Sequence, residues 1–172
     1  TDRCGLRCRY CMPEEGVAWL EHDRILSYEQ IVALVRAAVG LGIDTVRLTG
    51  GEPLVRKGLD KLVWAVKAID GIRTVTLTTN GVLLAQQLPA LRAAGLDGVN
   101  LSLDTLDRGQ YAAITRRDSL HEALAGLEAA LNTPGLRVKL NCVPLGENDS
   151  QLVPLAALAR ERALDVRFIE LM

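Results

Sequence analysis

The sequence lacks an excess of either charge, and it lacks any long apolar run. Lysine and arginine together number 20 against 21 acidic residues, which gives a formal net charge of −1. This balance provides no general basic surface for nucleic acid and no acidic tail typical of disorder. No apolar stretch approaches the roughly eighteen residues of a membrane helix, and no basic-then-apolar leader appears at the start of the sequence. We therefore expect a soluble cytoplasmic protein without nucleic-acid or membrane partners.

The chain has the size of one domain. Its 172 residues, 49% of them hydrophobic, can bury one core more readily than two. It begins at Thr1 without an initiator methionine and ends at Met172, directly after an expected strand. We expect residues 1–172 to be a single core domain excerpted from a longer protein.

Regular alternation of residue types predicts an α/β fold. Runs that alternate apolar and polar residues near glycine or asparagine predict strands over residues 45–51, 74–80, 98–104, 137–143 and 165–171. Apolar spacing of three and four predicts helices over residues 27–42, 59–69, 83–95, 120–132 and 150–163. Strand and helix alternate, so we expect a parallel sheet with right-handed crossovers. Counting the end of an earlier strand at the cysteine-rich N-terminus gives six strand positions and a partial (β/α)6 TIM-like barrel.

Each expected strand has one apolar face and one polar face. Because strands covered by helices on both sides are normally apolar on both, the polar face should line a concave, wet or ligand-filled interior. Arg47, Lys139 and Arg167 stand on three strands and all have the inward parity. Three inward cations without a matching set of anions would be costly as structure. Asp104 could pair with one of them, which is the plain structural alternative.

Three of the four cysteines stand within eight positions of each other: Cys4, Cys8 and Cys11. This clustering favours a metal or redox centre over two disulfides. Cys142 lies far away with apolar parity, so we assign it to packing.

Three thiolates fit either zinc or an iron–sulfur cluster, and spacing alone does not choose between them. A closed zinc site needs a fourth ligand, for which His22, His121 and Asp2 are available. A four-iron cluster held by three cysteines instead leaves one iron open to an outside ligand, which a catalytic cluster can use.

The pattern C-x-x-x-C-x-x-C, here "CGLRCRYC", resembles the cluster loop of the radical S-adenosylmethionine superfamily. Further stretches occur in order along the whole chain: "TDRC", "YCMPEE", "RLTGGEPL", "TTNG", "VNLSLD", "KLN" and "RFIELM". These resemble the GTP 3',8-cyclase family of molybdenum-cofactor biosynthesis. The resemblance implies a lyase that cleaves S-adenosylmethionine reductively to a deoxyadenosyl radical and cyclises GTP to 3',8-cyclo-7,8-dihydro-GTP.

The resemblance also implies residue roles. The ligands of a [4Fe-4S] cluster would be Cys4, Cys8 and Cys11. Contacts to S-adenosylmethionine would come from Tyr10, Gly51, Glu52, Ser102 and Met172. Contacts to GTP would come from Arg47, Thr78, Lys139 and Arg167. No side chain is assigned as a catalytic acid, base or nucleophile.

Other parts of the family pattern fall outside this chain. They are an N-terminal strand with a substrate-binding arginine and a C-terminal segment with a second three-cysteine [4Fe-4S] cluster. The resemblance further implies a reductant protein such as flavodoxin or ferredoxin, and it leaves room for a homodimer.

Plainer explanations exist for each motif. The glycines of "GGEP" suit a strand-to-helix turn. Tyr10 and Met172 could simply pack, and Thr78 and Ser102 could fill a polar interior. Two other functions also remain open: another radical S-adenosylmethionine enzyme that modifies peptides or haem, and a zinc-stabilised binding module without catalysis.

Overall fold

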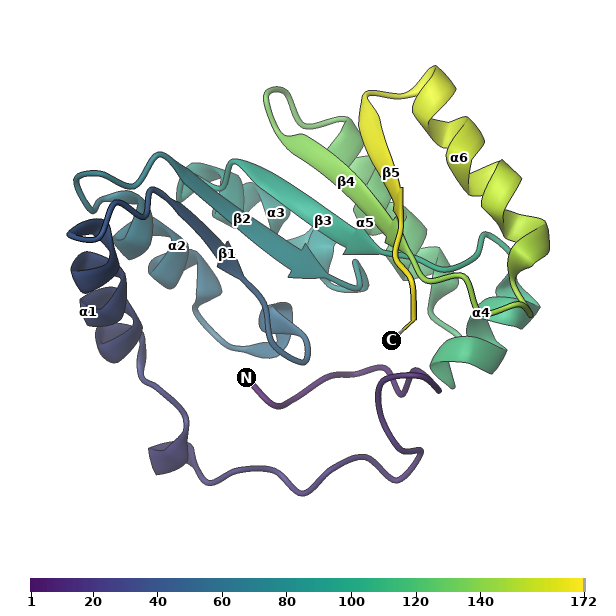
Figure 1. Ribbon diagram of the computed structural model, residues 1–172, viewed down its shortest axis with the longest axis horizontal. Helices are drawn as coiled ribbons and strands as arrows, with labels where there is room; N and C mark the ends of the chain where they lie inside the picture. The colour runs from purple at the N-terminus through teal and green to yellow at the C-terminus, as the bar shows by residue number, and fades with distance from the viewer. Residues whose placement is uncertain (172) are drawn as a thin grey trace.

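The computed structural model, which describes residues 1–171, contains one parallel sheet of five strands (Figure 1). Strand order follows chain order, and every neighbouring pair is parallel. The strands are β1 (Thr45–Leu48), β2 (Thr74–Thr79), β3 (Gly98–Ser102), β4 (Arg137–Cys142) and β5 (Leu164–Phe168). Each begins within one residue of its expected start. The predicted α/β class with a parallel sheet is confirmed.

Six α-helices and three short 3-10 helices connect the strands. The α-helices are α1 (Tyr28–Val39), α2 (Leu59–Lys67), α3 (Leu84–Ala93), α4 (Arg108–Thr115), α5 (Leu120–Leu131) and α6 (Leu152–Glu161). The 3-10 helices are η1 (His22–Arg24), η2 (Pro53–Val55) and η3 (Asp149–Gln151). Five of the α-helices lie in predicted ranges, whereas α4 was not predicted. Within residues 1–171, no helix is both long enough and apolar enough to span a bilayer.

Local signals at two helix starts are confirmed. Ser27 Oγ accepts from Gln30 N, and Gln30 Oε1 accepts from Ser27 N, which together form the expected capping box at α1. Pro154 lies in the first turn of α6, where its missing N–H has no helical partner to lose.

The two faces of the sheet differ as expected. In β2, Val75 and Leu77 are fully buried, while Thr76 and Thr78 between them are half-buried. Figure 1 shows α2, α3 and α5 behind the sheet, and the N-terminal segment, in purple, running below the strands. The core therefore lies between the sheet and one layer of helices, and the opposite face carries the polar side chains.

The strand register places those polar side chains in rows across the sheet. One row contains Thr78, Asn100, Lys139 and Asp165. The next row contains Ser102, Asn141 and Arg167. Arg47 pairs with Thr76, in a row nearer the strand starts than that of Thr78. Because register partners in parallel strands point to the same face, all these side chains share the polar surface.

The N-terminal segment occupies the place where a sixth strand was expected, but residues 1–21 contain no strand or helix. Two backbone hydrogen bonds join it to the segment after β1: Gly51 N to Thr1 O at 2.8 Å and Glu52 N to Arg3 O at 2.7 Å. A Cβ at Gly51 would lie 2.5 Å from the carbonyl oxygen of Arg3. The strand expected before the cysteine-rich segment therefore has no counterpart within residues 1–21, although their backbone does lie against the end of β1.

Asp97, just before β3, joins three elements. Its Oδ2 accepts from Lys67 Nζ of α2 and from Val75 N of β2, both at 2.7 Å. Partial burial raises the pKa of Asp97, but these hydrogen bonds outweigh it and hold the pKa below its ordinary value. A carboxylate with a lowered folded-state pKa stabilises the fold above its unfolded-state pKa, and this stabilisation is lost as the pH falls through the folded-state value.

We predict that Asp97→Ala lowers the free energy of unfolding by about 1–3 kcal/mol at pH 7, because two donors lose their acceptor. Urea denaturation measures this loss. The difference in unfolding free energy between the variant and the parent protein should become smaller in acid. Asp70→Ala, at an exposed carboxylate, is the control. An equal loss in the control, or a gap that grows in acid, would contradict the assignment.

We predict that Gly51→Ala costs about 1–3 kcal/mol of stability, because the new methyl group meets backbone rather than a movable side chain. Gly5→Ala is a matched control in the same region, since its Cβ would have no neighbour within 4 Å. Thermal and urea unfolding of both variants should separate them. Similar losses at the two positions would show that crowding at Gly51 does not matter.

Candidate functional site

The three N-terminal cysteines lie on one loop, residues 4–12, which we call the cysteine loop. The amides of Cys11 and Met12 both donate to Cys8 O at 2.9 Å, which forms a turn. The amides of Arg7 and Arg9 donate to Thr115 O and Ile114 O at the end of α4, also at 2.9 Å. The loop is therefore shaped by its own turn and by a helix that the sequence did not reveal.

All four cysteines are free thiols. Cys4 and Cys8 are half-buried, and Cys11 is exposed. Burial, followed by the nearby charge of Asp104, raises the pKa of Cys8 to about 12, and burial also raises the pKa of Cys4. Since metals bind thiolates, metal binding at this loop would release protons.

The donor set suits an iron–sulfur cluster. The His22 side chain lies outside the part that the structure describes; among the side chains that it does describe, no three His, Cys, Asp or Glu are grouped closely enough to hold a metal ion. The cysteines of an iron–sulfur cluster are soft thiolate ligands of separate iron atoms, so they need not meet at one point. Three free thiols on one partly exposed loop fit this requirement.

Glu52 links the cysteine loop to the ends of β1 and β2. Its Oε1 accepts from Thr79 Oγ1 at 2.8 Å and from Leu54 N at 3.0 Å, and its Oε2 accepts from Asn80 N at 2.7 Å. The side-chain nitrogen of the same residue, Asn80 Nδ2, lies 3.8 Å from Cys4 Sγ. Burial raises the pKa of Glu52 despite these hydrogen bonds. Protein donors thus use three of the four or so acceptor positions of this carboxylate.

Gly51 offers a ligand only its carbonyl group, because its N–H is bonded to Thr1 O. An ammonium donates hydrogen bonds, so a carbonyl oxygen is the group it needs. The predicted contact of Gly51 with the amino group of S-adenosylmethionine is compatible with this geometry and stays a prediction.

Tyr10 is hydrogen-bonded to Asp104, in the segment that follows β3. Its hydroxyl donates to Asp104 Oδ2 at 2.8 Å, and Asp104 Oδ1 accepts from Val143 N at 2.8 Å. Burial raises the pKa of Asp104 and that of Tyr10. Asp104 therefore pairs with Tyr10 and not with an inward cation, so the structural alternative considered for the cations is wrong in this respect.

The three inward cations share the polar face without forming one cluster. Arg47 on β1 and Arg167 on β5 are exposed. Lys139 on β4 lies three strands from β1, about 14 Å at the usual spacing of strands. Lys139 Nζ lies 3.2 Å from Asp165 Oδ2, a partner that the sequence analysis missed. The parity that places Arg167 inward also places Asp165 inward, and this signal could have identified the pair.

The remaining predicted positions have mixed outcomes. Thr78 and Ser102 are half-buried on the polar face, and Asn100 Nδ2 lies 3.5 Å from Thr78 Oγ1. Cys142 is fully buried in the core, as expected for packing. Met172 lies outside the described residues. The predicted contacts of Thr78, Ser102 and Met172 with ligands stay predictions.

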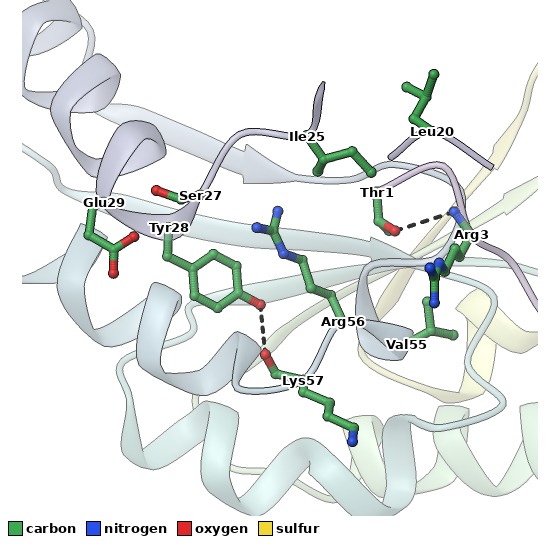
Figure 2. Close-up of a pocket in the computed structure, with 10 residues that line it drawn as sticks. All are labelled: Thr1, Arg3, Leu20, Ile25, Ser27, Tyr28, Glu29, Val55, Arg56 and Lys57. Atoms are coloured by element: carbon green, nitrogen blue, oxygen red, sulfur yellow. Dashed lines mark hydrogen bonds between the residues drawn. The ribbon is translucent and has the colours of Figure 1, made fainter. Parts of the chain in front are cut away.

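Two cavities flank the N-terminal segment. The larger, of about 620 Å³, lies between this segment and the start of α1 and contains none of the predicted site residues. Figure 2 shows Arg56 beside the ring of Tyr28 there, with the Tyr28 hydroxyl bonded to Lys57 O. The smaller, of about 280 Å³, borders the cysteine loop at Gly5 and includes Glu52. Only the smaller cavity adjoins the predicted site.

Comparison with known proteins identifies the family of the chain. Residues 1–159 match the Radical SAM superfamily. The GTP 3',8-cyclases of Pelotomaculum thermopropionicum and Moorella thermoacetica are 53% and 50% identical over the whole chain, which covers 53% and 54% of those proteins. Human molybdenum cofactor biosynthesis protein 1 is 45% identical over the whole chain, which covers 27% of it. The chain thus spans about half the length of its bacterial relatives.

Solved structures share the fold at low identity. Methylornithine synthase (PylB) has a TM-score of 0.77 at 20% identity, with 99% of this chain and 51% of that one covered. The anSMEcpe structure with bound AdoMet has a TM-score of 0.77 at 16% identity, with 100% and 49% covered. With the superfamily match over residues 1–159, the chain belongs to the radical S-adenosylmethionine superfamily.

Proposed function

We propose that this chain is the S-adenosylmethionine-binding core of a GTP 3',8-cyclase that acts in molybdenum-cofactor biosynthesis. One observation carries the proposal: the cysteine loop lies at the carboxyl ends of the strands, in contact with residues of "TTNG" and "SLD". Asn80 reaches Cys4, and Asp104 holds Tyr10. In α/β folds, ligands bind at the carboxyl ends of parallel strands. The identity to GTP 3',8-cyclases over the whole chain supports the choice of substrate.

In this proposal Cys4, Cys8 and Cys11 hold a [4Fe-4S] cluster. When bound and reduced, such a cluster supplies the electron that cleaves S-adenosylmethionine to methionine and a deoxyadenosyl radical. The residues of this chain bind and orient. The Gly51 carbonyl and Glu52 face the amino group of S-adenosylmethionine, while Tyr10, Ser102 and Met172 contact the rest of it. The polar face of the sheet receives GTP through Arg47, Thr78, Lys139 and Arg167.

Further parts of the proposal concern the whole protein. Residues 1–172 form one domain of a longer enzyme. A second [4Fe-4S] cluster is bound by a part of that enzyme outside this chain. An electron must come from outside, so a reductant protein such as flavodoxin or ferredoxin is part of the proposal. A cytoplasmic location and a homodimer complete it.

Another radical S-adenosylmethionine activity is the second candidate. It is favoured by the fold shared with methylornithine synthase and anSMEcpe, two proteins that are not named as GTP 3',8-cyclases and that both have TM-scores of 0.77. Binding measurements on the cations of the polar face would separate the two candidates, because a triphosphate calls for several positive charges.

We predict that the full-length protein, reconstituted anaerobically with iron and sulfide, releases deoxyadenosine from S-adenosylmethionine after reduction. Cys4→Ala, Cys8→Ala and Cys11→Ala should each lose the cluster of this loop, because a three-cysteine cluster has no spare protein ligand. Iron and sulfide per chain, together with deoxyadenosine, measure the result.

Cys142→Ala is the matched control, since this thiol is buried in the core. It should keep its iron, although the lost sulfur costs some stability. Iron loss in Cys142→Ala without iron loss in Cys8→Ala would overturn the ligand assignment. One tightly bound zinc in place of iron would instead favour the binding module.

We predict that Arg47→Ala, Lys139→Ala and Arg167→Ala each weaken GTP binding by roughly ten- to a hundredfold, the value of a hydrogen bond to a charged group. Guanosine binding should change much less. Asp165→Asn should strengthen GTP binding, because Asp165 competes for Lys139 at 3.2 Å. Titrations of the full-length protein with both ligands measure these effects.

Arg36→Ala, at an exposed arginine of α1, controls for net charge. If guanosine binding weakens as much as GTP binding, the three cations have a structural role and do not bind the triphosphate. Equal weakening by Arg36→Ala would reduce the effect to general electrostatics.

A further inference from the structure

The carboxyl end of α4 holds the cysteine loop. The last carbonyl groups of a helix have no partner within the helix. In α4 two of these, Ile114 O and Thr115 O, accept from the amides of Arg9 and Arg7. These two amides flank Cys8 on either side. The position of the Cys8 backbone is therefore set by the end of α4.

The next residue, Arg116, reaches back over the same loop. Its Nη1 lies 3.0 Å from Arg7 O and 3.3 Å from Met12 O. Its Nε lies 3.6 Å from Glu14 Oε2. One guanidinium thus joins the backbone just before Cys8 to the backbone just after Cys11. The loop between these points contains both cysteines and Tyr10.

The backbone of Arg116 is unusual. It adopts φ 54° and ψ 27°, and it is the single non-glycine residue with positive φ among residues 1–171. Glycine is the usual residue in this left-handed position after a helix, because a side chain there costs energy. An observed outlier of this kind points to a role for the side chain. The contacts of Arg116 with the loop supply such a role.

We propose that Arg116 is a positioning residue that holds the cysteine loop ready for its cluster. Its planar guanidinium, with donors in fixed directions, suits a bridge between two carbonyl groups better than a single ammonium does. The proposal rests on the proposed function in one respect, namely that the cysteine loop binds a cluster. The hold of Arg116 on the loop is independent of that.

The test compares the full-length protein with Arg116→Gly, which removes the guanidinium and suits the left-handed backbone. Without cluster, hydrogen–deuterium exchange in peptides that span residues 7–12 should become roughly tenfold faster or more, since hydrogen bonds to a charged group are lost. Exchange in β2 and β3 and the thermal midpoint should stay at parent values or improve. After anaerobic reconstitution, iron per chain should fall below that of the parent.

Two further variants sharpen the result. Arg108→Ala removes another arginine of α4, which bonds Asp118 and makes no contact with the loop among the hydrogen bonds of the described residues. It should match the parent in exchange and iron. Arg116→Lys should rescue part of the iron uptake, because an ammonium keeps the charge and can still donate to a carbonyl.

Unchanged loop exchange or unchanged iron in Arg116→Gly would overturn the proposal. So would faster exchange throughout the sheet with a lower thermal midpoint, because Arg116 would then support the whole fold. A parent protein that binds no iron would overturn the cluster role together with the proposed function. In that case the hydrogen–deuterium exchange data would still show whether Arg116 holds the cysteine loop, independently of the cluster.

Discussion

A loop without strands or helices must find hydrogen-bond partners for its backbone elsewhere, and the cysteine loop finds them on its neighbours. The Arg7 guanidinium donates within the loop to Cys4 O and Leu6 O at 2.7 and 2.8 Å. Further support comes from α4 and the residue after it, and from Asp104, which accepts from the Tyr10 hydroxyl. Because Tyr111 and Ile114 of α4 are buried, the helix has little freedom to shift. The arrangement of the thiols therefore depends on a short helix packed more than 100 residues further along the chain.

The sheet separates stability from ligand binding. Its apolar face packs against the helices, where residues such as Val75, Leu77 and Leu140 are fully buried. Its polar face contributes little to that core, so charged and hydroxyl side chains can stand there without being buried. Two buried, hydrogen-bonded carboxylates, Glu52 and Asp104, lie at the carboxyl ends of the strands. Asp104 joins the scaffold to the cysteine loop directly through Tyr10, and Glu52 does so through Asn80, whose side chain contacts Cys4.

The sequence predicted the repeated elements well, because alternation and helical spacing reflect burial directly. Helix α4 escaped prediction for physical reasons: it has eight residues, includes Gly109, and buries only Tyr111, Ile114 and Thr115. Its start did carry a signal, since Asp107 caps Gln110 N in the way Ser27 caps α1. The strand expected before the cysteine loop has no counterpart in residues 1–21, whose backbone makes only isolated hydrogen bonds to the segment after β1.

The candidate site was predictable at the level of motifs and less so at the level of contacts. Spacing and resemblance selected the three cysteines. Parity placed Arg47, Lys139 and Arg167 on one face, and the strand register agrees with that placement. The partner of Tyr10 could not be predicted, because Tyr10 and Asp104 are brought together only by the fold. The partner of Lys139 was missed although the inward parity of Asp165 carried a signal for it. Arg116 was missed because a positive φ at an arginine leaves no trace in the residue pattern.

The pairing of Lys139 with Asp165 affects how any anion would bind there. The lysine side chain is 30% exposed and that of its partner 67% exposed, so the pair stays in contact with water. An anion that took the place of the carboxylate would gain only the difference between two ion pairs rather than the full strength of one. The displaced Asp165 would then add its own repulsion unless it turned toward solvent. A weakly charged ligand would therefore leave the internal pair intact, whereas a ligand with concentrated negative charge would compete with Asp165 for the ammonium.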